Sequence, residues 1–150
     1  MPALTYTLLH RVRYRECDPM GVVYHTHYLD WFEAARTEAL RAAGLPYKSL
    51  EDAGIIMPVV EATLRYHGSA RYDDLLEVEA TFAERPRVRV PIDYAVRRTG
   101  ETEVLVSGRV VLCFVDVARG RPTAAPEGVT AAFDRVEADP SLAATLGGDA

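Results

Sequence analysis

Apolar and polar residues alternate along several stretches of the chain, a pattern typical of strands that bury one face of a sheet. The alternation is clearest in residues 76–82 and 88–96, and β-branched residues are frequent in 57–67. Thr99 and Gly100 form a turn after the second alternating stretch, which predicts a long hairpin. The predicted strands are residues 5–13, 57–67, 76–82, 88–96 and 103–116.

Between the first two strands the period changes to that of a helix. At 100° per residue the apolar side chains of residues 28–43 fall in one broad arc, which predicts a long helix with one buried face. Thr26 is suited to its N-cap, and Arg36 falls inside the arc, where we expect it to pair with an acid from the sheet or from a partner subunit. The predicted buried residues are Tyr28, Leu29, Trp31, Phe32, Ala35, Ala39, Leu40, Ala42 and Ala43.

This order of elements predicts an α+β fold with an antiparallel sheet and one long helix to cover it. We expect one domain over residues 1–150, with short helices at 47–53 and 126–136 and a frayed tail from about residue 137. Strands of this length leave open edges, and the single lysine of the chain lies outside them. A homodimer with a continuous sheet is therefore expected.

The loop before the long helix carries the strongest candidate for catalysis. Asp18 and Pro19 begin a turn that Gly21 completes, and the apolar run that follows is expected to be buried. The first N–H groups of the helix lack intrahelical partners and can stabilise an oxyanion near Asp18. A carboxylate beside such a helix start suggests acyl transfer, although an Asp-Pro pair commonly serves only to begin a turn.

These residues resemble the signature of the 4-hydroxybenzoyl-CoA thioesterase family of hot-dog proteins. The similarity is greatest to the branch of short-acyl-CoA thioesterases associated with the Tol-Pal system, in which the aspartate precedes Gly-Val-Val-Tyr-His. Two later runs, residues 71–78 and 114–116, also match the family. The residues that carry the resemblance are Tyr14, Asp18, Gly21, Val22, Val23, Tyr24, His25, Tyr28 and the run 33–38.

The resemblance implies a five-stranded antiparallel hot-dog sheet wrapped around one helix, in a dimer that is often doubled to a tetramer. It implies hydrolysis of a short-chain or aromatic acyl-CoA, or of an acyl carrier protein thioester. Asp18 would act as nucleophile or general base. His25 would assist through its imidazole or its main-chain N–H, and Tyr14 matches a tyrosine of the same branch. Structural roles remain open for both of these residues.

Substrate binding divides between the acyl group and coenzyme A, which is part of the substrate and not a separate cofactor. We expect Gly21, Val22, Val23 and Tyr24 to border the acyl group. Arginine matches phosphate geometry, but a solvated charge is the alternative role at each candidate position. The candidates for the phosphates are Arg65, His67, Arg71, Arg87 and Arg89.

Composition argues against several classes of binding partner. A net charge of −5 argues against a nucleic-acid binder, and no apolar run reaches about 18 residues, so neither a membrane span nor a signal peptide is expected. We therefore expect a cytoplasmic protein, in which Cys17 and Cys113 remain thiols. Cys17 adjoins Asp18, but we expect it to fill space rather than to act as a nucleophile. His25 and His27, with Glu16 nearby, raise the question of a metal, but no further Cys/His cluster supplies a third and fourth ligand, so no metal is expected.

Two other functions stay open at this point. One is another hot-dog activity, such as dehydration of a hydroxyacyl thioester, whose His and Glu pattern is not matched here. The other is a thioester-binding or scaffold module without turnover. Release of free thiol from an acyl-CoA would distinguish hydrolysis from both.

Overall fold

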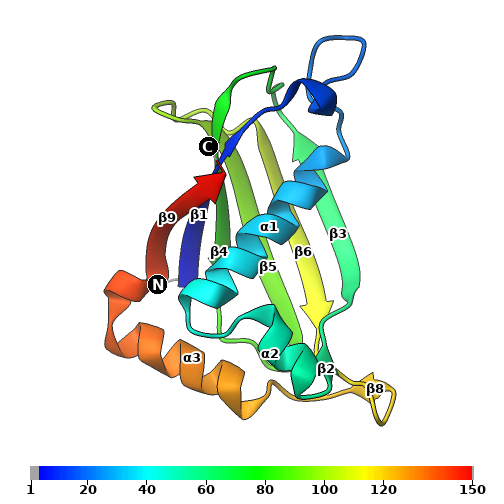
Figure 1. The fold of residues 1–150 in the computed structure, drawn as a ribbon, viewed down its shortest axis with the longest axis vertical. Coiled ribbons are helices and arrows are strands. Elements are labelled where there is room, and N and C mark those ends of the chain that lie inside the picture. The colour runs from blue at the N-terminus through cyan, green and yellow to red at the C-terminus, as the bar shows by residue number, and fades with distance from the viewer. Residues whose placement is uncertain (1–3, 150) are drawn as a thin grey trace.

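The fold is a curved sheet with one long helix lying across its concave face (Figure 1). The structure is a computed structural model that describes residues 4–149. The sheet order is β3-β6-β5-β4-β1-β9, with antiparallel pairing throughout except for β9, which runs parallel to β1. The strands are β1 (Leu4–Arg11), β3 (Val59–Tyr66), β4 (Leu75–Phe82), β5 (Arg89–Arg98), β6 (Val106–Cys113) and β9 (Ala144–Asp149). The predicted five-stranded antiparallel sheet is confirmed, and β9 adds a strand beside it.

Helix α1 (His27–Ala42) packs on the middle of the sheet because its apolar arc faces inward. Phe32 is fully buried and stacks on Tyr94 of β5, with ring centroids 4.2 Å apart. Beneath Phe32 the sheet carries Gly108, where a Cβ atom would lie only 2.6 Å from the phenyl ring. The absence of a side chain at this position lets the helix approach the sheet closely.

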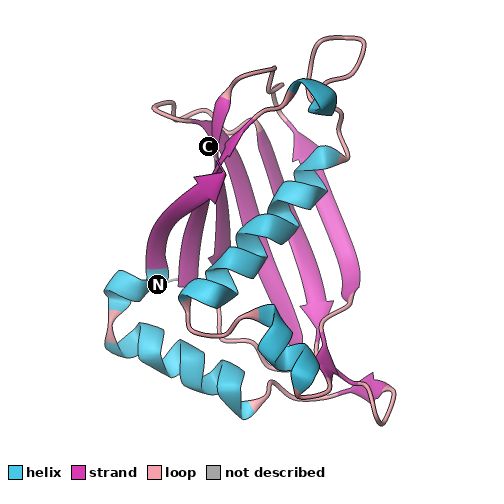
Figure 2. Ribbon diagram, in the orientation of Figure 1, coloured by secondary structure: helices cyan, strands magenta, loops and turns pink. Residues whose placement is uncertain are grey.

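Shorter elements close the end of the sheet far from the Asp18 loop (Figure 2). They include α2 (Tyr47–Asp52), α3 (Glu127–Ala138) and a small sheet of β2 (Ile55–Ile56), β7 (Val115–Asp116) and β8 (Arg121–Pro122). Short 3₁₀ turns, η1 (Tyr14–Glu16) and η2 (Pro140–Ala143), precede the Asp18 loop and β9. No helix within residues 4–149 is long and apolar enough to cross a membrane.

Strand β3 forms one edge of the sheet and has almost no cover on either face. Seven of its eight residues are exposed, including Val59, Val60 and Tyr66, whereas β4 and β5 alternate between buried and half-buried positions. An edge strand with exposed apolar residues on both faces is an open surface for pairing.

Four local expectations differ from the structure. Leu29 lies at the border of the apolar arc and is 41% exposed, and Tyr24 points outward although its neighbour Val23 is buried. Arg36 meets the hydroxyl of Tyr94 at 3.2 Å rather than an acid. The tail expected to be frayed contains the end of α3, η2 and β9, because β1 offers a free edge with which residues 144–149 pair. Residue 150 lies outside the described residues.

Candidate active site

Asp18 lies on a tight loop at the end of the sheet where α1 begins, as the Asp-Pro turn predicted. The main chain closes on itself through Asp18 N–H to Val22 O and Gly21 N–H to Asp18 O, each 2.9 Å, and Gly21 has the positive φ of 79° that this turn requires. The carboxylate Oδ1 accepts the Met20 N–H at 2.9 Å. Within residues 4–149 no donor binds Oδ2, so this oxygen is available for chemistry.

Two main-chain contacts hold the part of the loop after Gly21 against neighbouring segments of the chain. Val23 forms an antiparallel bridge with Cys17 and donates its N–H to Ala70 O at 2.9 Å. A Cβ atom placed on Gly21 would lie 3.9 Å from Nη1 of Arg71, so that guanidinium stands beside the loop. The loop is therefore anchored at its base while its tip stays exposed.

His25 stands at the entrance to α1, seven residues after Asp18. Its ring lies 4.5 Å from that of Tyr24 and meets Tyr66 edge-on at 6.2 Å, and its main-chain oxygen accepts the Tyr66 hydroxyl at 3.0 Å. The main-chain N–H groups of His25 and Thr26 have no acceptor among the described residues, and the Thr26 side chain makes no capping bond. These free N–H groups lie at the positive end of the helix dipole.

Tyr14 and Cys17 lie just before Asp18 and differ in exposure. Tyr14 belongs to η1, is 80% exposed, and packs only edge-on against Tyr72 at 5.5 Å. Partial burial and the nearby charge of Glu16 raise the pKa of the Cys17 thiol above its ordinary value. A thiol that stays protonated at neutral pH is a poor nucleophile.

The comparisons with known proteins agree with this arrangement of sheet, helix and loop. Residues 12–133 match the thioesterase-like superfamily. The chain belongs to this superfamily of hot-dog proteins. It is 34% identical over 128 residues to the acyl-CoA thioesterase YbgC of Haemophilus influenzae, covering 85% of this chain and 93% of that protein. It is 30% identical over 100 residues to the 4-hydroxybenzoyl-CoA thioesterase of Pseudomonas sp. strain CBS-3, covering 65% of this chain and 71% of that one.

A solved structure shows the same architecture. The DHNA-CoA thioesterase of Staphylococcus aureus superposes with a TM-score of 0.81 at 26% sequence identity, covering 91% of this chain and 93% of that one. The family resemblance and the hot-dog fold predicted from the sequence are both confirmed.

In this thioesterase-like chain the candidate phosphate ligands fall into two groups. Arg65, His67 and Arg71 lie at the Asp18 end of the sheet, where His67 Nε2 is 2.9 Å from Ser107 Oγ. Arg87 and Arg89 lie at or before the start of β5, at the opposite end. A ten-residue strand spans about 30 Å, so the second group is remote from Asp18 within one protomer.

The four residues expected to border the acyl group also differ in their exposure to solvent. Val23 is buried in the core and offers no surface to a substrate, whereas Gly21 and Tyr24 are exposed and Val22 is half-buried. Arg36, in turn, holds the Tyr94 hydroxyl from the helix. Burial raises the pKa of Tyr94, so its phenol stays neutral beside this guanidinium.

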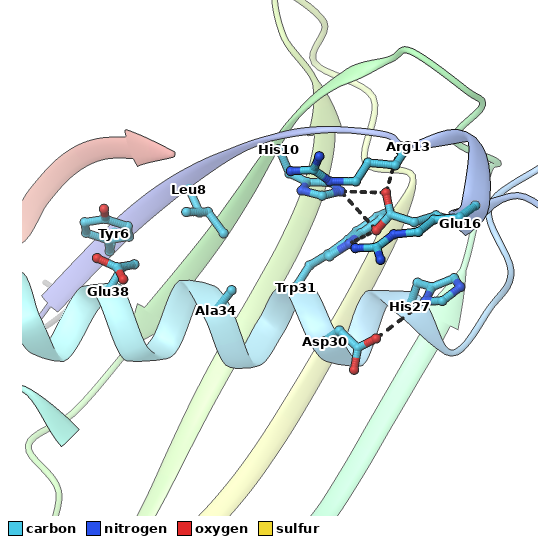
Figure 3. Close-up of a pocket in the computed structure, with 11 residues that line it drawn as sticks. Tyr6, Leu8, His10, Arg13, Glu16, His27, Asp30, Trp31, Ala34 and Glu38 are labelled. Atoms are coloured by element: carbon cyan, nitrogen blue, oxygen red, sulfur yellow. Dashed lines mark hydrogen bonds and ion pairs between the residues drawn. The ribbon is translucent and has the colours of Figure 1, made fainter. Parts of the chain in front are cut away.

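The thioesterase-like fold also has a large cavity that Asp18 does not line. It is a groove of about 790 Å³ between β1 and α1, shown in Figure 3. At its upper end the buried His10 and Glu16 are hydrogen-bonded at 2.9 Å, and the Trp31 indole N–H donates to Glu16 at 2.8 Å. The groove is lined by Tyr6, Leu8, His10, Arg13, Arg15, Glu16, His27, Asp30, Trp31, Ala34 and Glu38.

Sequence reasoning missed this network of His10, Glu16 and Trp31. The inward position of His10 in the alternation of β1 was a usable signal, because a buried imidazole requires a hydrogen-bonding partner. Glu16 was considered only as a third metal ligand. Within residues 4–149 no three His, Cys, Asp or Glu side chains come together as such a site, and His27 Nδ1 instead lies 3.4 Å from Asp30.

Proposed function

We propose that this chain is an acyl-CoA thioesterase that hydrolyses short-chain or aromatic acyl thioesters, with Asp18 as nucleophile or general base. The observation that carries the proposal is a carboxylate with a free oxygen on the loop that leads into α1, whose entrance carries two main-chain N–H groups without an acceptor among the described residues. Thioester hydrolysis requires both parts: a group that attacks or activates water, and donors for the carbonyl oxygen as it becomes negative. Relatives named as acyl-CoA thioesterases support the substrate class.

Hydrolysis of the thioester can be written as a balanced reaction with Asp18 in either role. As a general base it takes a proton from water, hydroxide adds to the thioester carbon, and the C–S bond breaks to release the CoA thiol and the free acid. As a nucleophile it forms a mixed anhydride and expels the thiolate, and water then hydrolyses the anhydride. In both routes the N–H groups of His25 and Thr26 stabilise the tetrahedral oxyanion.

Coenzyme A would approach over the surface that joins the loop to β3. Arg65 and Arg71 both lie at this end of the sheet, and neither side chain is paired among the described residues. Guanidinium groups suit phosphate oxygens, so we assign the CoA phosphates to these two arginines. Arg87 and Arg89 are too far from Asp18 of the same protomer to share this role.

The active assembly would be a homodimer formed at the β3 edge, or a pair of such dimers. Exposed apolar residues on both faces of β3, including Val59 and Val60, need a cover in solution. The same edge carries Tyr66, which binds the main chain of His25 at the helix entrance. A partner at β3 would therefore lie next to the site.

Release of free thiol, followed with a chromogenic thiol reagent, tests the function. Acyl-CoA substrates of increasing chain length, 4-hydroxybenzoyl-CoA and an acyl carrier protein thioester would establish the preference. Asp18→Asn keeps the shape but removes the charge, and we expect kcat to fall at least about 100-fold. Asp52→Asn, at an exposed ion pair with Lys48, is the matched control and should not change kcat.

Activity of Asp18→Asn within about threefold of the unchanged protein would remove Asp18 from the mechanism. Tight binding of acyl-CoA without thiol release would favour a binding module. Loss of water from a hydroxyacyl-CoA would favour a dehydratase.

A further inference from the structure

The carboxylate of Glu16 links three elements around the base of the Asp18 loop. Glu16 is only 8% exposed, and its Oε1 accepts the main-chain N–H of Arg13 at 2.7 Å. The same oxygen lies 2.9 Å from His10 Nε2 on β1, and Oε2 accepts the indole N–H of Trp31 on α1 at 2.8 Å. Figure 3 shows these groups converging on the carboxylate at the end of the groove.

The main chain of Glu16 connects this network to the candidate catalytic loop. Its carbonyl oxygen accepts the Tyr24 N–H at 2.9 Å, so both limbs of the loop meet at Glu16. Asp18 follows two residues later on one limb, and the free N–H of His25 follows Tyr24 directly on the other. The position of Glu16 therefore sets both catalytic components relative to the sheet and the helix.

A contribution to stability does not by itself explain the buried carboxylate of Glu16. A buried carboxylate loses its hydration, and replacing a buried ion pair with apolar side chains is often neutral or stabilising. Three donors in fixed directions do, however, restrict where the carboxylate can lie, which a hydrophobic contact would not do. The arrangement is better suited to orienting a segment than to holding the fold together.

We propose that Glu16 is a positioning residue for hydrolysis: its buried carboxylate, fixed by His10, Trp31 and the Arg13 N–H, holds Asp18 opposite the main-chain donors of the helix entrance. This inference rests on the proposed function of Asp18. Its structural half, that Glu16 orders the loop, can be measured whether or not the protein hydrolyses thioesters.

Glu16→Gln tests the proposal because the amide cannot satisfy both N–H donors. Each carboxylate oxygen accepts one of them, Arg13 N–H on one side and the Trp31 indole on the other. An amide has a single oxygen, so in either orientation its NH₂ group faces an N–H donor. Adding Trp31→Phe removes the indole donor and leaves the amide oxygen for Arg13, so the double variant should recover.

We expect Glu16→Gln to lower kcat about 10- to 100-fold with KM within about threefold, since a small misplacement of a catalytic group costs this much. The double variant should regain at least about fivefold in kcat over Glu16→Gln. Glu38→Gln, on the helical wall of the same groove and paired with Arg41, is the matched control and should keep full activity.

Hydrogen–deuterium exchange supplies the readout that does not depend on activity. Exchange of residues 17–25 should rise in Glu16→Gln, return toward that of the unchanged protein in the double variant, and stay unchanged in Glu38→Gln. Glu16→Asp keeps the charge but cannot reach all three donors, and it serves as a second variant if the amide prevents folding. This variant should also show a lower kcat and faster exchange of residues 17–25, each to a smaller extent than Glu16→Gln.

Unchanged kcat and unchanged loop exchange in folded Glu16→Gln or Glu16→Asp would overturn the proposal. Equal losses in Glu16→Gln and in the double variant would overturn it as well, because the donor conflict would then not be the cause. Full activity of Asp18→Asn would instead defeat the proposed function, and the exchange data would still decide whether Glu16 orders the loop.

Discussion

The hydroxyl of Tyr66 donates a hydrogen bond to the main-chain oxygen of His25 across 3.0 Å. Tyr66 ends the exposed edge strand β3, and His25 begins the approach to α1. This bond joins the surface at which a second protomer would pair to the peptide group whose N–H, that of Thr26, is one of the two candidate oxyanion donors. In the proposed dimer and site, one side chain would therefore connect assembly with catalysis.

Tyr66→Phe should lower kcat about fivefold with little change in KM. A single hydrogen bond contributes about 1 kcal/mol, and its loss frees the peptide of His25 while leaving the ring in place. Steady-state kinetics measure the effect. Tyr72→Phe, another exposed tyrosine at the same end of the sheet, is the control, and equal effects of the two changes would disprove a specific role for Tyr66.

His25→Ala should reduce kcat by less than about tenfold. The imidazole makes no side-chain hydrogen bond to a described residue, whereas the main-chain N–H of residue 25 survives the substitution. Thiol release at saturating substrate measures the change. A fall of about 100-fold or more would transfer the principal role to the imidazole.

Val60→Glu places a charge on the open edge strand and should shift the protein toward monomer. If the site is completed by the partner, kcat should fall in parallel with the dimer fraction, and both should fall on dilution. Sedimentation velocity and thiol release on the same samples make the comparison. Val117→Glu introduces the same charge at an exposed valine away from β3 and should change neither.

A fully active monomer at assay concentration would contradict both the shared sheet and the shared site. Dimers of Val60→Glu with unchanged affinity would contradict the choice of β3 as the interface.

Acidification should destabilise the protein through Glu16. Burial opposes ionisation of this carboxyl group, but hydrogen bonds from the Arg13 N–H, His10 and Trp31 outweigh it and lower the pKa from 4.5. A carboxyl group with a lower pKa in the folded state stabilises that state above the unfolded pKa, and this contribution is lost as pH falls through the folded value. Denaturant titrations from about pH 7 to about pH 3 should show the loss below pH 4.5.

The Glu16→Gln protein lacks this titration. Its free energy of unfolding should therefore approach that of the unchanged protein at the acid end of the series. A constant difference between the two proteins across the whole range would show that folding does not lower the pKa of the Glu16 carboxyl group.

The sequence was informative where a repeating pattern carried the structure. The alternation around Val78 and Val96 and the arc around Phe32 predicted the sheet, the helix and the buried faces, because periodicity reports directly which side is covered. It failed at Leu29, on the border of the arc, where a residue can face either way. Strand β9 was missed because glycine and alanine carry little strand preference, and its pairing depends on a distant edge.

The Asp18 loop could be predicted from the sequence, but the network of Glu16 that supports the loop could not. Asp18, Pro19 and Gly21 act through local turn chemistry, which a sequence shows. The partners of Glu16 are separated from it by 6 and 15 positions, and only the packing of β1 against α1 brings them together. Arg36 illustrates the same limit, since its partner Tyr94 is 58 positions away on another strand.

Gly108 lies on β6, the strand next to the β3 edge, far along the chain from the Asp18 loop, and receives the ring of Phe32. A helix seated in this way cannot slide along the sheet without driving Phe32 into the side chains that flank the glycine. The start of α1 therefore has a fixed position along the sheet. A residue inserted into the loop, or deleted from it, would have to be accommodated within the loop itself, where it would change the approach of Asp18 to the helix start and leave the rest of the fold in place.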